Sequence, residues 1–281
     1  MIVKHIVFFR SLFIYLLIFL WFGNIALAGE ITSSWQNNYN SSARLLIGNY
    51  NSDKKLIIGL ELSIEKGSYS YWRNPGDSGI PPIINFKKSI NIEKFDIKYP
   101  VPEIITHSFG SSNGYKDNVI FPIILELVDE KKPLNINITF DYGICDRVCV
   151  PVRNELSYKI NNLILLSEHK SLLIDRALNL VPNYDNTMER KVIIAKMTED
   201  LEDNLYLTVE LNASENSSVF IEENEKLYLS KIDPSKILAN GNLELYYEIH
   251  SNQPIDIIIG QILSLIVIDD NYLIKEDIII E

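Results

Sequence analysis

The chain has 281 residues, of which 47% are hydrophobic and 22% charged, a composition typical of folded proteins with one large or two small domains. Acidic residues outnumber basic ones by 37 to 26, the formal net charge is −11, and no basic stripe offsets it, which argues against nucleic-acid binding. Two cysteines and four histidines are too few for a cysteine-rich zinc site, an iron–sulfur cluster or a scaffold held by many disulfides.

The N-terminus has the layout of a secretory signal peptide. Lys4, His5 and Arg10 give a positive start, an apolar run follows over residues 11–22, and a small-residue pattern allows cleavage after Ala28. The alternative is an uncleaved membrane anchor, because the apolar stretch approaches the ~20 residues that span a bilayer. Cleavage would release the mature chain into an oxidising compartment, where a cysteine pair can form a disulfide.

The first half of the chain has the pattern of short strands. In Leu134–Phe140 every second side chain is apolar, which is the alternation expected of a half-buried strand. Clusters of Gly, Ser and Asn at 74–79 and 110–114 are predicted to be turns between strands. Many short strands punctuated by turns indicate an antiparallel β-sandwich. The predicted strands are residues 43–49, 54–65, 69–73, 94–99, 119–128, 134–141 and 153–160.

One helix and a second β-rich region follow. Ser167 is the predicted N-cap, apolar residues recur at helical spacing from Leu172 to Leu180, and Pro182 ends the pattern. We therefore predict an all-β protein: a first sandwich, one linking helix near 168–181, and a second β-rich domain. The second set of predicted strands is residues 191–197, 204–212, 218–222, 226–229, 243–250, 262–268 and 272–280.

Both cysteines lie close together, since three residues separate Cys145 from Cys149 between two predicted strands. A hairpin end would bring them within disulfide reach, but so short a loop adds little chain-entropy stabilisation. Arg147 would favour a thiolate and Asp146 would oppose it. The spacing is not Cys-x-x-Cys, so the thioredoxin-type signature is absent. Spacing alone leaves redox exchange and a structural disulfide as open alternatives, while a metal site is disfavoured because His107 is the one histidine available as a further ligand.

Four segments in sequence order carry a resemblance to a known family. They are the cysteine segment 145–151, the aromatic segment 69–82, the loop 107–117 and the strand 119–123. Together these segments resemble the N-terminal periplasmic domain of the thiol:disulfide interchange protein DsbD, and more closely the short secreted proteins that carry this domain alone. The resemblance covers about residues 40–160.

The resemblance implies an immunoglobulin-like β-sandwich with a redox cysteine pair in its hairpin region. Cys149 would form the mixed disulfide with a partner, and Cys145 would be the resolving thiol. An aromatic cap would shield the pair, although the aromatic residues at 69–72 would also suit core packing. The side chains expected to shield the cysteines are Phe109, Tyr69, Tyr71 and Trp72. The implied domains are a signal peptide (1–28), a redox domain (29–165), a helix with connector (166–189) and a second β-rich domain (190–281).

The implied function is a periplasmic relay of electrons, from a membrane-embedded thiol reductase to periplasmic disulfide proteins, with a family link to cytochrome c biogenesis. Thiol–disulfide exchange needs neither a metal nor an organic cofactor, so none is predicted. Contact with the membrane is expected only through an uncleaved N-terminal segment. This sequence lacks the membrane module and the thioredoxin-like domain of the full-length family protein, so the electron donor would be a separate protein. The alternative is a non-catalytic binding module of two β-sandwiches with a structural disulfide.

Overall fold

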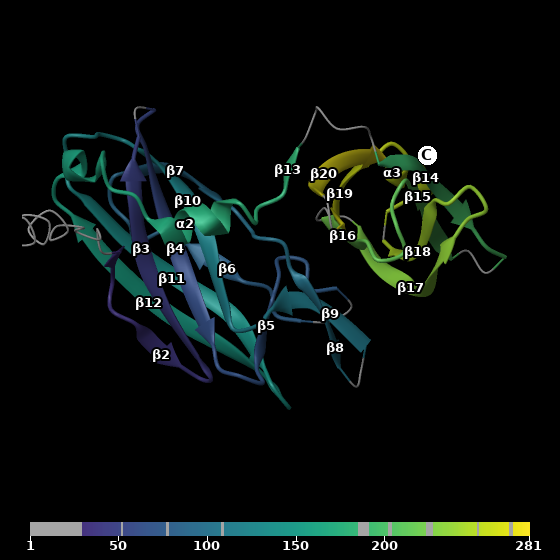
Figure 1. Ribbon diagram of the computed structural model, residues 1–281, viewed down its shortest axis with the longest axis horizontal. Coiled ribbons are helices and arrows are strands. Elements are labelled where there is room, and N and C mark those ends of the chain that lie inside the picture. The colour runs from purple at the N-terminus through teal and green to yellow at the C-terminus, as the bar shows by residue number, and fades with distance from the viewer. Residues whose placement is uncertain are drawn as a thin grey trace, which may run out of the picture. The chain divides into compact units, whose positions relative to one another are not determined.

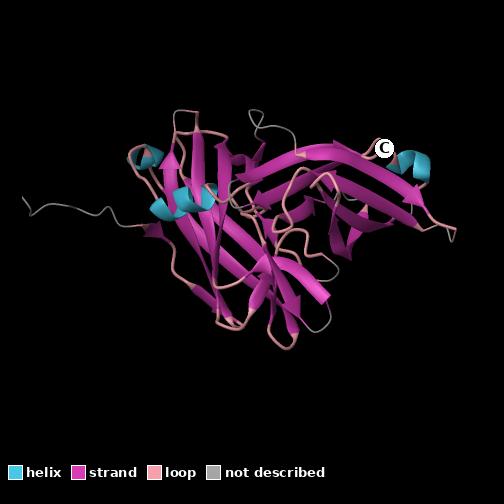
Figure 2. Ribbon diagram, turned by 45° about the vertical axis from the view of Figure 1, so that its right-hand side comes forward, coloured by secondary structure: helices cyan, strands magenta, loops and turns pink. Residues whose placement is uncertain are grey.

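The computed structural model describes residues 30–51, 53–76, 79–107, 110–184, 191–201, 204–222, 227–251, 253–269 and 272–281. Residues Ile31–Glu281 belong to one compact unit. The predicted signal peptide lies outside the described residues. Within the described part of the chain, no helix has both the length and the apolar character needed to cross a membrane. Strands make up most of the described structure (Figure 2).

Residues 31–160 form two sheets whose strand pairs are all antiparallel (Figure 1). The first sheet has the order β1-β3-β4-β10-β7, with β2 paired to β3. Its strands are β1 (Ile31–Thr32), β2 (Gln36–Asn38), β3 (Ser41–Tyr50), β4 (Lys55–Ile64), β7 (Ile92–Ile97) and β10 (Asn118–Leu127). The second sheet has the order β12-β11-β5-β9-β8, with β6 paired to β11. Its strands are β5 (Tyr69–Tyr71), β6 (Ile83–Asn85), β8 (Glu103–His107), β9 (Gly110–Tyr115), β11 (Leu134–Cys145) and β12 (Cys149–Ile160).

The core of this first sandwich draws apolar side chains from both sheets. Along β11 the buried and half-buried positions alternate up to Asp141, which is why one face of the strand reaches the core. A polar link crosses the core: the Tyr142 hydroxyl lies 2.9 Å from Ser41 Oγ and accepts a hydrogen bond from Asn154 at 3.3 Å. These buried polar groups join the two sheets, and the hydrogen bonds between them offset the cost of removing them from water. Large core side chains include Leu45, Ile58, Leu60, Trp72, Phe121, Ile123 and Phe140.

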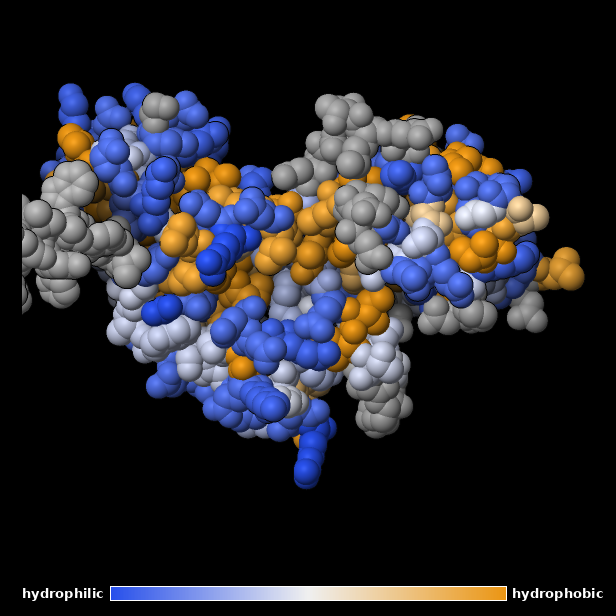
Figure 3. Space-filling view, viewed as in Figure 1, coloured by the Kyte–Doolittle hydropathy of each residue, from blue (hydrophilic) through white to orange (hydrophobic). Residues whose placement is uncertain are grey.

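The linking helix is shorter than predicted and begins later. Ser171, rather than Ser167, is the N-cap, because its Oγ accepts a hydrogen bond from the Ile174 N–H at 3.2 Å. Ser167 instead ends a 3₁₀ turn. Ile174 is 2% exposed and anchors the helix on the first sheet, where Gly48 and Gly59 provide room: a Cβ on either would lie 3.1 Å from it. Apolar surface gathers around this helix (Figure 3). The 3₁₀ turn η1 is Leu163–Leu166 and the helix α2 is Leu172–Leu178.

Residues 183–279 form two further four-stranded sheets with a core of their own. Their orders are β13-β20-β19-β16 and β14-β15-β18-β17, and β13 pairs with β20 in parallel while the other pairs are antiparallel. The strands are β13 (Asn183–Tyr184), β14 (Val192–Glu199), β15 (Leu205–Leu211), β16 (Ser218–Glu222), β17 (Tyr228–Ile237), β18 (Leu243–His250), β19 (Ile262–Asp269) and β20 (Tyr272–Ile279). A short helix that was not predicted, α3 (Ile255–Ile258), precedes β19.

The prediction of an all-β protein with an immunoglobulin-like antiparallel sandwich is confirmed. Each predicted strand has a counterpart, whereas β1, β2, β6, β8, β9 and β13 were not predicted. The turn predicted at 110–114 is wrong, because these residues form most of β9 and pair with β8 and β5. Small side chains permit this close pairing: a Cβ on Gly114 would overlap the carbonyl oxygen of Ser70. The predicted domain boundaries stay predictions.

Candidate functional site

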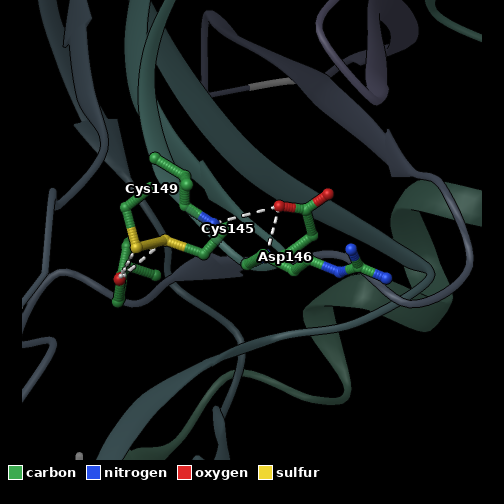
Figure 4. Close-up of a disulfide and its surroundings, with 6 residues drawn as sticks. Cys145, Asp146 and Cys149 are labelled. Carbon is green, nitrogen blue, oxygen red and sulfur yellow. Dashed lines mark hydrogen bonds between the residues drawn. A yellow bond between two sulfur atoms is a disulfide. The ribbon is translucent and has the colours of Figure 1, made fainter.

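The two cysteines lie at the end of the long β11–β12 hairpin. The antiparallel register runs without a break from Leu134 opposite Ile160 to Cys145 opposite Cys149. This register places the cysteine Cα atoms 4.1 Å apart, and the two sulfurs form a disulfide (Figure 4). Both sulfurs therefore lie at one end of the second sheet, and the three residues between the cysteines form the tip of the hairpin.

Asp146 holds the tip of the hairpin in shape. Its carboxylate accepts hydrogen bonds from the backbone N–H groups of Arg147 and Val148, the latter at 3.1 Å (Figure 4). These backbone donors lower the pKa of Asp146, Val148 first and Arg147 next. The carboxylate is therefore charged at neutral pH, and it fixes the turn independently of the disulfide. Val148, at 66% exposure, projects from the tip into solvent beside the cysteines.

Burial distinguishes the two cysteines. Cys145 is completely buried, while Cys149 is exposed at the start of the edge strand β12. A thiolate from another protein must approach a disulfide sulfur in line with the bond it breaks, so access decides which sulfur is attacked. Of the two bonded cysteines, Cys149 is the one exposed to solvent and Cys145 is enclosed.

Tyr71 places its hydroxyl against both sulfurs, 2.8 Å from Cys145 Sγ and 3.1 Å from Cys149 Sγ. Strand β5 sets this position because it pairs with the end of β11, with Tyr69 opposite Cys145. Burial is the main cause that raises the pKa of Tyr71, followed by its hydrogen bond with Tyr69. The hydroxyl therefore keeps its proton and can donate it in a hydrogen bond to a thiolate sulfur.

Two glycines make room for the Tyr71 ring. A Cβ on Gly143 would lie 3.0 Å from the ring, and a Cβ on Gly79 would lie 2.5 Å from it. Gly143 stands inside β11, only two residues before Cys145. Sequence reasoning did not identify this position, although a glycine inside a strand is a signal of close approach by another group.

The remaining expected shielding residues fall in different places. Tyr69 is half-buried, and its ring packs edge-on against Tyr71 with centroids 5.6 Å apart. Trp72 is completely buried in the core, where it contacts Phe220 with centroids 5.9 Å apart. Phe109 lies outside the described residues. Of the expected shielding side chains that the structure describes, Tyr69 and Tyr71 lie beside the disulfide. Trp72 packs in the core instead.

The cysteine hairpin lies within a segment that is similar to a known protein family. Residues 44–159 match the family described as the N-terminal part of the thiol:disulfide interchange protein DsbD. The crystal structure of the N-terminal periplasmic domain of ScsB from Proteus mirabilis is similar, with a TM-score of 0.67 and 19% identity over 90% of this chain and 99% of that one. At this identity the likeness shows a shared fold, and its coverage includes the second sandwich. No curated protein sequence matches the chain.

Proposed function

Because residues 44–159 match the DsbD N-terminal family, we propose that this chain is a periplasmic thiol–disulfide exchange protein that relays electrons through Cys145 and Cys149. The observation that carries the proposal is the difference in exposure between the two bonded cysteines, together with the tyrosine hydroxyl that contacts both sulfurs. A purely structural disulfide requires neither feature.

Reduction of the pair begins at Cys149. A donor thiolate attacks Cys149 Sγ, so a donor–Cys149 bond forms while the Cys145–Cys149 bond breaks and Cys145 leaves as a thiolate. A second donor thiolate then attacks the donor sulfur of the mixed disulfide, which releases the Cys149 thiolate and leaves the donor oxidised. Two electrons have moved from the donor to the pair.

Reoxidation follows the same path in reverse. The Cys149 thiolate attacks one sulfur of an acceptor disulfide, and the other acceptor sulfur leaves as a thiolate. Cys145 then attacks Cys149 Sγ, which restores the internal disulfide and releases the acceptor fully reduced. Because Cys145 stays buried beside Tyr71, its thiolate would be stabilised by a hydrogen bond while it is shielded from other oxidants.

The proposed partners follow from the family. The donor would be a membrane-embedded thiol reductase, the acceptors would be periplasmic disulfide proteins, and export would depend on the signal segment with cleavage after Ala28. The proposed shielding by Phe109 rests on the resemblance alone.

The reduction potential of the Cys145–Cys149 pair tests the proposed function. Structural disulfides lie below about −300 mV, whereas pairs that exchange with partners lie above it. Equilibration of the full chain with glutathione buffers, followed by thiol trapping, measures the potential. A value above this limit is expected; a value below it would support the binding module with a structural disulfide instead.

A further inference from the structure

The second sandwich contacts the segment that follows Tyr71. Three consecutive residues, Trp72, Arg73 and Asn74, each touch β16. Asn74 donates a buried hydrogen bond to the carbonyl oxygen of Ile221 at 2.7 Å, and Trp72 packs edge-on against the Phe220 ring. A strand from one sandwich thus holds the backbone that leads directly from the sulfur-contacting tyrosine of the other.

An ion pair strengthens this contact. Glu222 lies at the end of β16 and is bound by two cations, Arg73 and, at 2.5 Å, Lys275. The Glu222 side chain is 13% exposed and that of Arg73 is 37% exposed, so the contact is shielded from water mainly on the carboxylate side. The Arg73 guanidinium also lies over two rings, 5.3 Å from the centroid of Trp72 and 5.0 Å from that of Tyr99. Arg73 is therefore fixed from both sandwiches.

We propose that Glu222 is a positioning residue for the redox pair, and that the second sandwich tunes the cysteines by fixing the segment that carries Tyr71. The inference rests on the proposed function and assigns a role to the second sandwich within it. The effect passes along the chain: Glu222 holds Arg73, Arg73 is two residues from Tyr71, and the Tyr71 hydroxyl contacts both sulfurs.

The same segment has a second set of anchors inside the first sandwich. Trp72 donates its backbone N–H to the Asn113 carbonyl at 2.9 Å, and Asn113 donates to the carbonyls of Pro75 at 2.9 Å and Asn74 at 3.2 Å. Loss of the Glu222 contact should therefore shift Tyr71 without releasing it. The expected effect on the cysteines is smaller than that of removing the Tyr71 hydroxyl itself.

The test measures how fast the reduced full-length protein reacts with iodoacetamide as a function of pH. Glu222→Gln should raise the midpoint of the rate profile by roughly 0.3–0.5 pH units, because a displaced hydroxyl stabilises the thiolate less. Glu222→Asp keeps the carboxylate and should restore most of the wild-type profile. Glu155→Gln is the matched control, since it removes a carboxylate from an exposed ion pair with Lys88.

A Tyr71→Phe/Glu222→Gln double variant shows whether the effect passes through the tyrosine. The double variant should have the same midpoint as Tyr71→Phe alone, since no hydroxyl remains to be displaced. The proposal is overturned if Glu222→Gln behaves like Glu155→Gln, or if its shift persists in the Tyr71→Phe background. The proposed function is tested separately by the reduction potential of the wild type. The alkylation profile does not depend on that outcome, because it can be measured for any reduced cysteine pair.

Discussion

Tyr71 places one hydroxyl within hydrogen-bond distance of two sulfurs that are bonded to each other. A disulfide sulfur is a weak acceptor, whereas a thiolate is a strong one, so the hydroxyl contributes most after the bond opens. The residue thus stabilises the reduced state of the pair more than the oxidised state. Its rigid placement between Gly79 and Gly143 makes the contact available without further ordering.

Tyr71→Phe removes this donor and keeps the ring. The midpoint of the alkylation profile should rise by about one pH unit, which corresponds to the hydrogen bond lost by the thiolate. The reduction potential should become more negative by up to ~30 mV, because the reduced form loses stabilisation. Tyr206→Phe serves as the control, since it removes an exposed hydroxyl that bonds Asp200 in the second sandwich. Equal profiles for Tyr71→Phe and wild type would show that the hydroxyl does not assist the thiolate.

At the scale of single residues, the sequence predicted the roles of rare residue types, such as cysteine, better than those of common ones. Two cysteines with three residues between them could be recognised as a pair, and their flanking strands implied a hairpin. Tyr71 and Trp72 could not be assigned different roles, because neighbouring residues of a strand point to opposite faces and the pattern does not say which face meets the sulfurs. Only the pairing of β5 with β11 decides that Tyr71 reaches the cysteines and Trp72 enters the core.

The β11–β12 hairpin carries its own organising element in Asp146. Two backbone hydrogen bonds to its carboxylate keep the tip closed. Since these bonds depress its pKa, the charged carboxylate holds the tip at neutral pH, and this support is lost as the pH falls through the lowered pKa. The thiols of the reduced protein therefore stay close to each other near neutral pH.

Comparison of Asp146→Ala with Asp146→Asn isolates these hydrogen bonds. Both substitutions remove the charge beside the cysteines, but asparagine keeps a side-chain acceptor for the tip. The alanine variant should have a less negative reduction potential than the asparagine variant by roughly 10–20 mV, since its reduced thiols are held together less well. Glutathione equilibration measures both. Identical potentials for the two variants would mean that the carboxylate does not organise the tip.

Strands and helices differ in how well their limits could be predicted. Long alternating strands such as β11 and β18 were placed within a few residues, because burial on one face imposes a period of two. The edge strand β8 and its neighbour β9 escaped prediction because neither alternates apolar with polar residues: β8 has two adjacent isoleucines and β9 consists mostly of small and polar residues. The start of α2 was misplaced because two serines, Ser167 and Ser171, precede the same apolar pattern.

The two sandwiches share buried contacts that join them into one structure. Phe220 and Ile266 come from the second sandwich, yet both pack into the core of the first. Phe220 is 3% exposed. If the sandwiches separated, this large apolar side chain would be exposed to water, which is unfavourable. We therefore expect the described structure to unfold as one cooperative unit.

Phe220→Ala should break that cooperativity. Truncation of a buried phenylalanine costs about 3–5 kcal/mol, and here the loss falls on the contact between sandwiches. The wild type should show one urea transition by both tryptophan fluorescence, which reports Trp35 and Trp72 of the first sandwich, and far-UV circular dichroism. The variant should show two transitions that differ between these probes. Phe95→Ala, at a 45% exposed ring, is the control. A single shifted transition in Phe220→Ala would contradict the expectation.

The short spacing of the cysteine pair has a further consequence for how this protein is made. The disulfide joins residues separated by four positions, and the sequence contains no third cysteine. The folding chain therefore has one intramolecular pairing available, so no disulfide isomerase is required to correct it. Because the disulfide closes a very short loop, its reduction adds little conformational entropy to the unfolded chain. The sandwich should therefore keep almost the same stability through repeated oxidation and reduction. Redox cycling and folding are in this way kept independent of each other.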